Sequence, residues 1–112
     1  MTKLERRWLD AITQLGCIVC WIFERVFSPA EPHHLLSGGR RRGHLFTIPL
    51  CPGHHRYGLD TDQAVSRDQC RRRFEARYGT EESLLAKTRE LVTQRFGLTL
   101  TIAGPHNHRR PA

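Results

Sequence analysis

The chain has 112 residues, which is the length of one modest domain, and contains no apolar run long enough to span a membrane. Its 18 lysines and arginines outnumber 11 acidic residues, and the resulting formal charge of +7 favours a polyanionic partner, although basic surfaces also serve solubility. The four cysteines are not preceded by a signal peptide, so we expect a reduced, cytoplasmic protein rather than a disulfide-linked secreted one.

A helix is predicted at the N-terminus. Thr2-Lys-Leu-Glu5 has the pattern of a capping box, in which the hydroxyl and the carboxylate satisfy free helix donors. Apolar residues then recur on one helix face: Leu4, Trp8, Ile12 and Leu15. We expect this face in the core, and Gly16 stands where a left-handed C-cap belongs.

Two short motifs together predict a zinc site. Cys17-Ile-Val-Cys20 alone has three interpretations: half of a zinc site, a redox pair, or two buried cysteines. The redox pair would open a helix in a βαβ unit, and no such unit is predicted here. Cys51-Pro-Gly-His54 supplies a second half, and three thiolates with one imidazole form the donor set of a structural zinc site. Either His54 or His55 is the fourth ligand.

Residues 31–57 carry five of the seven histidines. A short apolar segment follows His33-His34, and a second one, Phe46–Leu50, precedes His54-His55. Two strands around a Gly-rich connection, followed by a helix, would bring His33, His34 and His55 together, and such clustering indicates metal chemistry. Because neighbouring residues of a strand point to opposite sides, one of His33 and His34 can hold a metal while the other faces a substrate.

The connection between these strands is basic. Gly38-Gly39 permits a tight turn, and the next three residues present guanidinium groups suited to phosphate oxygens: Arg40, Arg41 and Arg42. The alternative is an ordinary solvated loop. His44 is either a further metal or substrate contact or a loop residue.

Two further helices are predicted. Residues 66–78 form a basic helix with Cys70, a free thiol, on its apolar stripe, and Thr80 caps a last helix that ends at Gly97. The apolar face of the last helix comprises Leu84, Leu85, Thr88, Leu91, Val92 and Phe96. Leu98–Ile102 alternates like a strand or an extended arm, through which a monomer would form a dimer. Residues 104–112 read as a flexible basic tail after a domain of residues 1–103.

The His-His pair, the loop and the strand ending in Leu50-Cys51 resemble the HNH, or ββα-metal, endonuclease motif. More closely, residues 48–56 (IPLCPGHHR) and 74–81 (FEARYGTE) resemble the phage Ref recombination-enhancement nucleases, which are described as RecA-dependent. The resemblance covers roughly residues 3–92.

Two positions depart from these families. His54 stands where the HNH motif usually has its last zinc-binding cysteine. Related sequences also carry a further histidine shortly after the position of Tyr57, where this chain has none. Asp60, Asp62, Gln63 or a water molecule would replace it.

The resemblance implies an α+β fold: a ββα-metal core with a zinc knuckle, an N-terminal helix and two C-terminal helices. It implies an endonuclease that hydrolyses DNA with a catalytic divalent ion (magnesium, manganese, zinc or nickel) besides the structural zinc on Cys17, Cys20, Cys51 and His54. RecA filaments are the implied protein partner, in a bacterial cell that hosts the phage or prophage.

The resemblance also assigns roles within the site. His33 and His55 would hold the catalytic ion, and His34 would be the general base, a role that suits a side chain with an ordinary pKa near 6.5. Exchanged roles for His33 and His34 are the local alternative, and His44 would belong to the same site. The implied DNA contacts are Arg40, Arg41, Arg42 and Arg56.

Two functions from other classes remain. The first is a zinc-stabilised DNA-binding module without catalytic activity, because the later histidine is missing. The second is a zinc deaminase, which requires His-x-Glu and Pro-Cys-x-x-Cys. Glu31 precedes the histidines and His54 replaces the second cysteine, so the deaminase is set aside.

Overall fold

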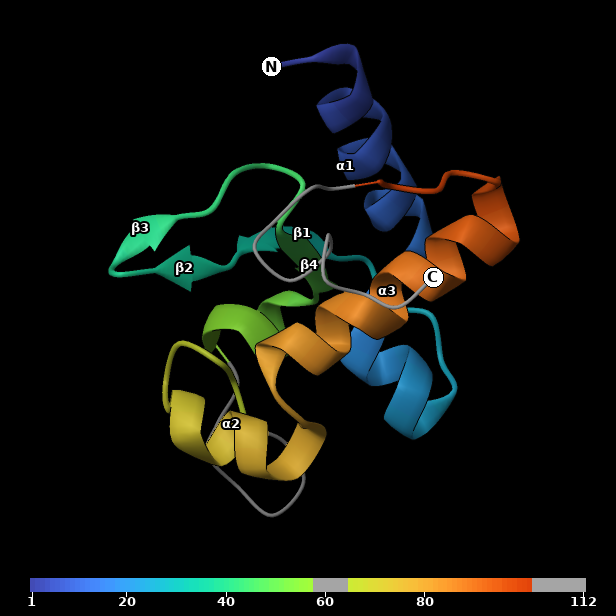
Figure 1. Ribbon diagram of the computed structural model, residues 1–112. Helices are drawn as coiled ribbons and strands as arrows, with labels where there is room; N and C mark the ends of the chain where they lie inside the picture. The colour runs from blue at the N-terminus through green and yellow to red at the C-terminus, as the bar shows by residue number, and fades with distance from the viewer. Residues whose placement is uncertain (58–64, 102–112) are drawn as a thin grey trace, which may run out of the picture.

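The computed structural model describes residues 1–57 and 65–101, and over these residues the fold is α+β (Figure 1). In chain order its elements are α1 (Lys3–Leu15), η1 (Cys20–Glu24), β1 (Glu31–His34), β2 (Leu36–Ser37), β3 (Arg40–Arg41), β4 (Thr47–Leu50), η2 (Gly53–Tyr57), α2 (Arg71–Tyr78) and α3 (Glu81–Phe96). The strands form two small antiparallel sheets, β1–β4 and β2–β3. Among the helices described, none is sufficiently long and apolar to cross a membrane.

Helix α1 begins with the predicted capping box. The backbone N–H of Glu5 donates to the Thr2 hydroxyl (3.0 Å), and the Thr2 N–H donates to the Glu5 carboxylate (2.7 Å). The expected apolar face is buried except at Leu4, which is 38% exposed. Gly16 ends the helix with φ 84° and ψ −178°, which is not the left-handed cap expected. Glycine is still required at this position, because an added Cβ would lie 2.7 Å from the Phe27 ring.

Helices α1 and α3 pack against each other and against β4, and this contact forms the core. Strand β4 is buried along its whole length. The predicted face of α3 contributes Leu84, Leu85, Thr88 and Val92, whereas Phe96 lies 37% exposed near its end. Trp8 is fully buried, and its indole N–H donates to the Thr47 hydroxyl (2.8 Å), which in turn donates to the His44 carbonyl (2.9 Å).

Replacing Thr47 by valine should lower the free energy of unfolding by about 1–3 kcal/mol, because the indole N–H of Trp8 would stay buried without an acceptor. The matched control is Thr88→Val. That hydroxyl is equally buried but only donates to the Leu84 carbonyl within α3 (2.7 Å), so its loss orphans no donor. Urea unfolding of both variants measures the difference, and equal losses would contradict the prediction.

Two expectations about elements were wrong. Helix α2 starts at Arg71 rather than at residue 66, because residues 67–69 form a turn and Cys70 is extended (φ −158°). Residues 98–101 form no strand, and Leu98 packs into the core, so its alternation with threonine reflects burial rather than sheet pairing. Cys70 is a free thiol, as expected, and is half-buried.

The segment after Cys20 is rich in apolar residues, but most of them lie outside the core. The single turn η1 buries Cys20, whereas Phe23, Val26 and Phe27 are 49%, 47% and 61% exposed. Phe23 lies in this turn with its ring 5.3 Å from that of Tyr78, whereas Val26 and Phe27 follow the turn. Asp60, Asp62, Gln63 and the tail at 104–112 lie outside the described residues.

Candidate functional site

The expected strand–loop–strand segment positions the histidines. Strand β1 pairs with β4 so that His33 lies opposite Ile48 and Glu31 opposite Leu50. The connection contains the β2–β3 hairpin, whose turn residues Gly38 and Gly39 have φ of 59° and 80°. After β4 the chain enters η2, a π-helical turn that carries His54 and His55.

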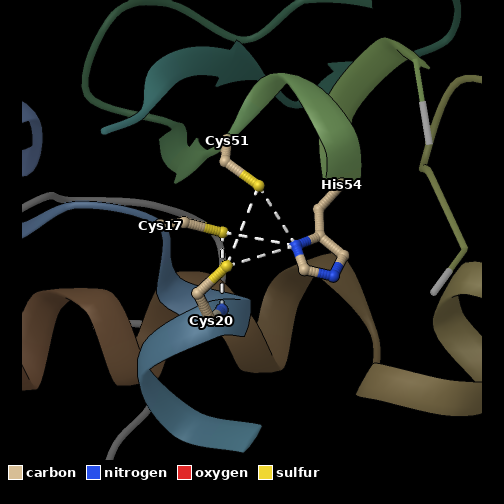
Figure 2. Close-up of side chains that lie close together, drawn as sticks. All are labelled: Cys17, Cys20, Cys51 and His54. Carbon is tan, nitrogen blue, oxygen red and sulfur yellow. Dashed lines mark hydrogen bonds between the residues drawn. The ribbon is translucent and has the colours of Figure 1, made fainter. Parts of the chain in front are cut away.

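The four predicted zinc ligands converge between η1 and η2 (Figure 2). The His54 Nδ1 atom lies 3.7 Å from Cys17 Sγ, 3.5 Å from Cys20 Sγ and 3.2 Å from Cys51 Sγ. The sulfurs of Cys20 and Cys51 are 3.8 Å apart. His54 is therefore the fourth member of the cluster, and His55 belongs to a different group.

These distances fit a tetrahedral zinc ion. Usual zinc bond lengths place two sulfur ligands about 3.8 Å apart, and a sulfur and a nitrogen about 3.5 Å apart. The Cys17 thiol, followed by His54, lowers the pKa of Cys51 to about 3 despite burial, whereas the same contact raises the pKa of Cys17. Cys51 is therefore a thiolate at neutral pH, which is the form that binds metals.

A second group of possible metal ligands comprises His33, His55 and Asp68. The Nδ1 atom of His33 lies 3.2 Å from Nε2 of His55, and an Asp68 carboxylate oxygen lies 3.8 Å from the same Nε2. Asp68 reaches this position because its backbone N–H donates to the His55 carbonyl (2.9 Å). His33 is buried, whereas Asp68 is exposed, so the group opens toward solvent.

Each histidine of this group also contacts a carboxylate. Nε2 of His33 lies 2.5 Å from Glu81, and Nδ1 of His55 lies 2.5 Å from Glu31. Burial raises the pKa of Glu81, but hydrogen bonds from His33 and Arg67 outweigh it and lower the pKa to about 2. For Glu31, hydrogen bonds from Arg56 and His55 likewise outweigh burial and lower the pKa.

The arginines near the site differ in their partners. Arg56, a predicted DNA contact, instead forms a two-pronged ion pair with Glu31 (2.7 and 2.9 Å). Arg42 donates to Glu82 (2.6 Å), and its guanidinium lies over the Phe46 ring. Arg40 and Arg41 are exposed on the β2–β3 hairpin. Contact of all four with DNA stays a prediction.

His34 and His44 form a separate pair. Nε2 of His34 lies 3.2 Å from Nδ1 of His44, so the adjacent histidines of β1 have different partners, as strand alternation predicts. Burial lowers the pKa of His34, and the positive charges of Arg41 and of the neighbouring histidines lower it further. His34 is therefore neutral at pH 7 and able to accept a proton.

The family model described as recombination enhancement, RecA-dependent nuclease matches residues 1–93, which include both ligand groups and the His34–His44 pair. The chain belongs to this family. A search of curated proteins finds none that matches this member of the RecA-dependent nuclease family.

Sequence reasoning missed three acidic residues in this RecA-dependent nuclease family member: Glu31, Asp68 and Glu81. Glu31 could have been found, because residues two apart on a strand share a face and Glu31 precedes His33 by two. Glu81 is 48 residues from His33 in the sequence. Its only sequence feature is its place in the first turn of a predicted helix, where acidic residues are common for reasons unrelated to a metal site. The position of Asp68 depends on the turn that precedes α2.

Proposed function

We propose that the chain is a metal-dependent DNA endonuclease of the HNH type. The observation that carries this proposal is the pair of imidazole nitrogens on His33 and His55, which face each other at 3.2 Å beside Asp68. Membership of a family of RecA-dependent nucleases supports it, since such an enzyme must assemble a metal site next to a general base.

The residues of this group suit a divalent ion. Metal–nitrogen bonds of ordinary length place two neighbouring nitrogens about 3.0–3.4 Å apart, which matches the His33–His55 distance. Nitrogen ligands favour zinc or nickel, and the Asp68 oxygen also suits manganese or magnesium. When bound, such an ion would polarise a phosphate oxygen and stabilise the leaving 3′-oxygen.

In this proposal His34 takes a proton from the water molecule that attacks phosphorus in line. Its neutral imidazole is half-buried, and His44 orients the ring from the side. The exchanged assignment is less favourable, because both ring nitrogens of His33 already have partners and only 5% of the residue is exposed.

Wild-type protein should nick supercoiled plasmid only when manganese or magnesium is present, and the family description leads us to expect a requirement for RecA filaments on the DNA. Assays with and without RecA, and with EDTA as the metal-free control, test both points. Protein that binds DNA but never cuts under any of these conditions would instead be a zinc-stabilised DNA-binding module.

Arg40 and Arg41 should contact phosphates, because both are exposed and the hairpin holds them beside the site. Replacing both by alanine should weaken binding to unrelated DNA sequences equally and reduce the slope of log affinity against log salt by about 2. Fluorescence anisotropy at several salt concentrations measures this slope. Arg42→Ala is the comparison and should reduce the slope less, because Arg42 is already paired with Glu82. A double variant with an unchanged slope would refute the contact.

A further inference from the structure

The two histidines of the proposed catalytic metal site are held in the same way. Each has one ring nitrogen facing the other histidine and the second ring nitrogen on a carboxylate, Glu81 for His33 and Glu31 for His55. Each carboxylate in turn accepts from an arginine: Arg67 donates to Glu81 (2.8 Å), and Arg56 donates to Glu31. The site thus contains two parallel chains of arginine, carboxylate and imidazole.

The position of the protons follows from the chemistry of these partners. A carboxylate paired with an arginine is ionised at neutral pH and only accepts hydrogen bonds. His33 must therefore carry its proton on Nε2, and His55 must carry its proton on Nδ1. In the neutral rings, the remaining nitrogens then direct two lone pairs at each other across 3.2 Å.

Two opposed lone pairs at this distance repel each other, and a cation bound to both removes the repulsion. We propose that Glu31 and Glu81 are positioning residues that hold the protons on the outer nitrogens, so that Nδ1 of His33 and Nε2 of His55 bind the ion. This inference rests on the proposed metal site and adds to it the binding atom of each histidine and the residue that selects that atom.

Glu81 is the more firmly held of the two carboxylates. Its side chain is 4% exposed, Arg71 lies 3.4 Å from its second oxygen, and its backbone N–H donates to Glu75 (2.9 Å). The Glu31 side chain is 27% exposed and has Arg56 as its second partner. Loss of such an outer carboxylate generally costs 10- to 100-fold in metal affinity, and we expect the larger loss at Glu81.

The test compares Glu81→Gln and Glu31→Gln with Glu82→Gln. Glu82 is next to Glu81 in the chain but pairs with Arg42, so its replacement leaves both histidines untouched. The measurement is manganese binding to protein that holds one zinc ion per chain, followed by electron paramagnetic resonance of the free manganese. Affinity should weaken about 10- to 100-fold in the first two variants and stay unchanged in the third. His33→Ala supplies the background from other sites.

A second readout uses wild-type protein alone and so does not depend on how the variants fold. In zinc-saturated protein labelled with 15N-histidine, His33 should be protonated on Nε2 and His55 on Nδ1. The opposite tautomer at either ring, or equal manganese affinity in all three glutamine variants, would overturn the proposal. The expected affinities and tautomers in a protein that never cuts DNA would leave the positioning role intact and refute only the nuclease assignment.

Discussion

Replacing His34 by alanine should slow metal-dependent nicking of DNA roughly 100- to 10,000-fold, because a general base contributes that much to the rate and little to substrate binding. DNA affinity, zinc content and melting temperature should stay close to those of the wild type, since the His34 side chain is only half-buried and lies outside both ligand groups. Single-turnover nicking, with anisotropy for binding, separates these quantities.

His55→Ala is the informative comparison. It should also abolish nicking, but together with the loss of the second, exchangeable ion, because a metal ligand rather than a base has been removed. His44→Ala should show a smaller loss of rate with the ion retained, since His44 only orients the ring of His34. A His34→Ala protein that cuts at the wild-type rate would exclude His34 as the base, whatever the other variants show.

Cys17, Cys20, Cys51 and His54 are positioned to hold a structural zinc ion, and removing that ion should unfold the protein. Structural zinc contributes about 10–16 kcal/mol in zinc-finger peptides, which equals or exceeds the whole free energy of unfolding of a typical small domain. Cys20→Ser should therefore lose the tightly held zinc and the cooperative melting transition, as measured by elemental analysis and circular dichroism. Added magnesium should not rescue the defect, because thiolate ligands suit zinc and magnesium prefers oxygen ligands.

Cys70→Ser is the matched control for the zinc experiment. Cys70 is a free, half-buried cysteine outside the cluster, so its replacement should retain one tightly held zinc per chain and melt near the wild-type temperature. Zinc on His33 and His55 would confuse the count, and a His33→Ala background removes it. If the native protein contained no zinc, or if treatment with a chelator left the melting temperature unchanged, the cysteines would be packing residues and not zinc ligands.

The cluster of Cys17, Cys20, Cys51 and His54 was predictable, because each half is a pair of metal-binding residues separated by two others. Three cysteines and one histidine are also a usual ligand set for structural zinc. The contact of His33 with His55 was also predictable, because two strands around a Gly-rich connection, followed by a helix, bring these residues together. Sequence order alone could not place Glu81 or Asp68, because their positions depend on how the chain returns to β1 after η2. The resemblance covered their positions but did not assign them a role.

The incorrect expectations came from local patterns that have more than one outcome. Apolar residues around Phe23 look like core, yet one helical turn cannot bury all of them. The alternation of apolar and polar residues after Gly97 looks like a strand, but no described strand pairs with residues 98–101. Instead Leu98 is buried in the core and Leu100 packs against it, partly buried. Burial and partners depend on tertiary structure, which periodicity does not contain.

The β2–β3 hairpin forms its own small sheet, separate from β1–β4, and in Figure 1 it extends away from the helices. Its turn is open, since added Cβ atoms at Gly38 and Gly39 would meet nothing within 4 Å. Doubling a loop costs only about 0.6 kcal/mol, so insertions at this tip would leave the register of His33 with Ile48 intact. The length of the hairpin can therefore vary independently of the strand pair that positions His33.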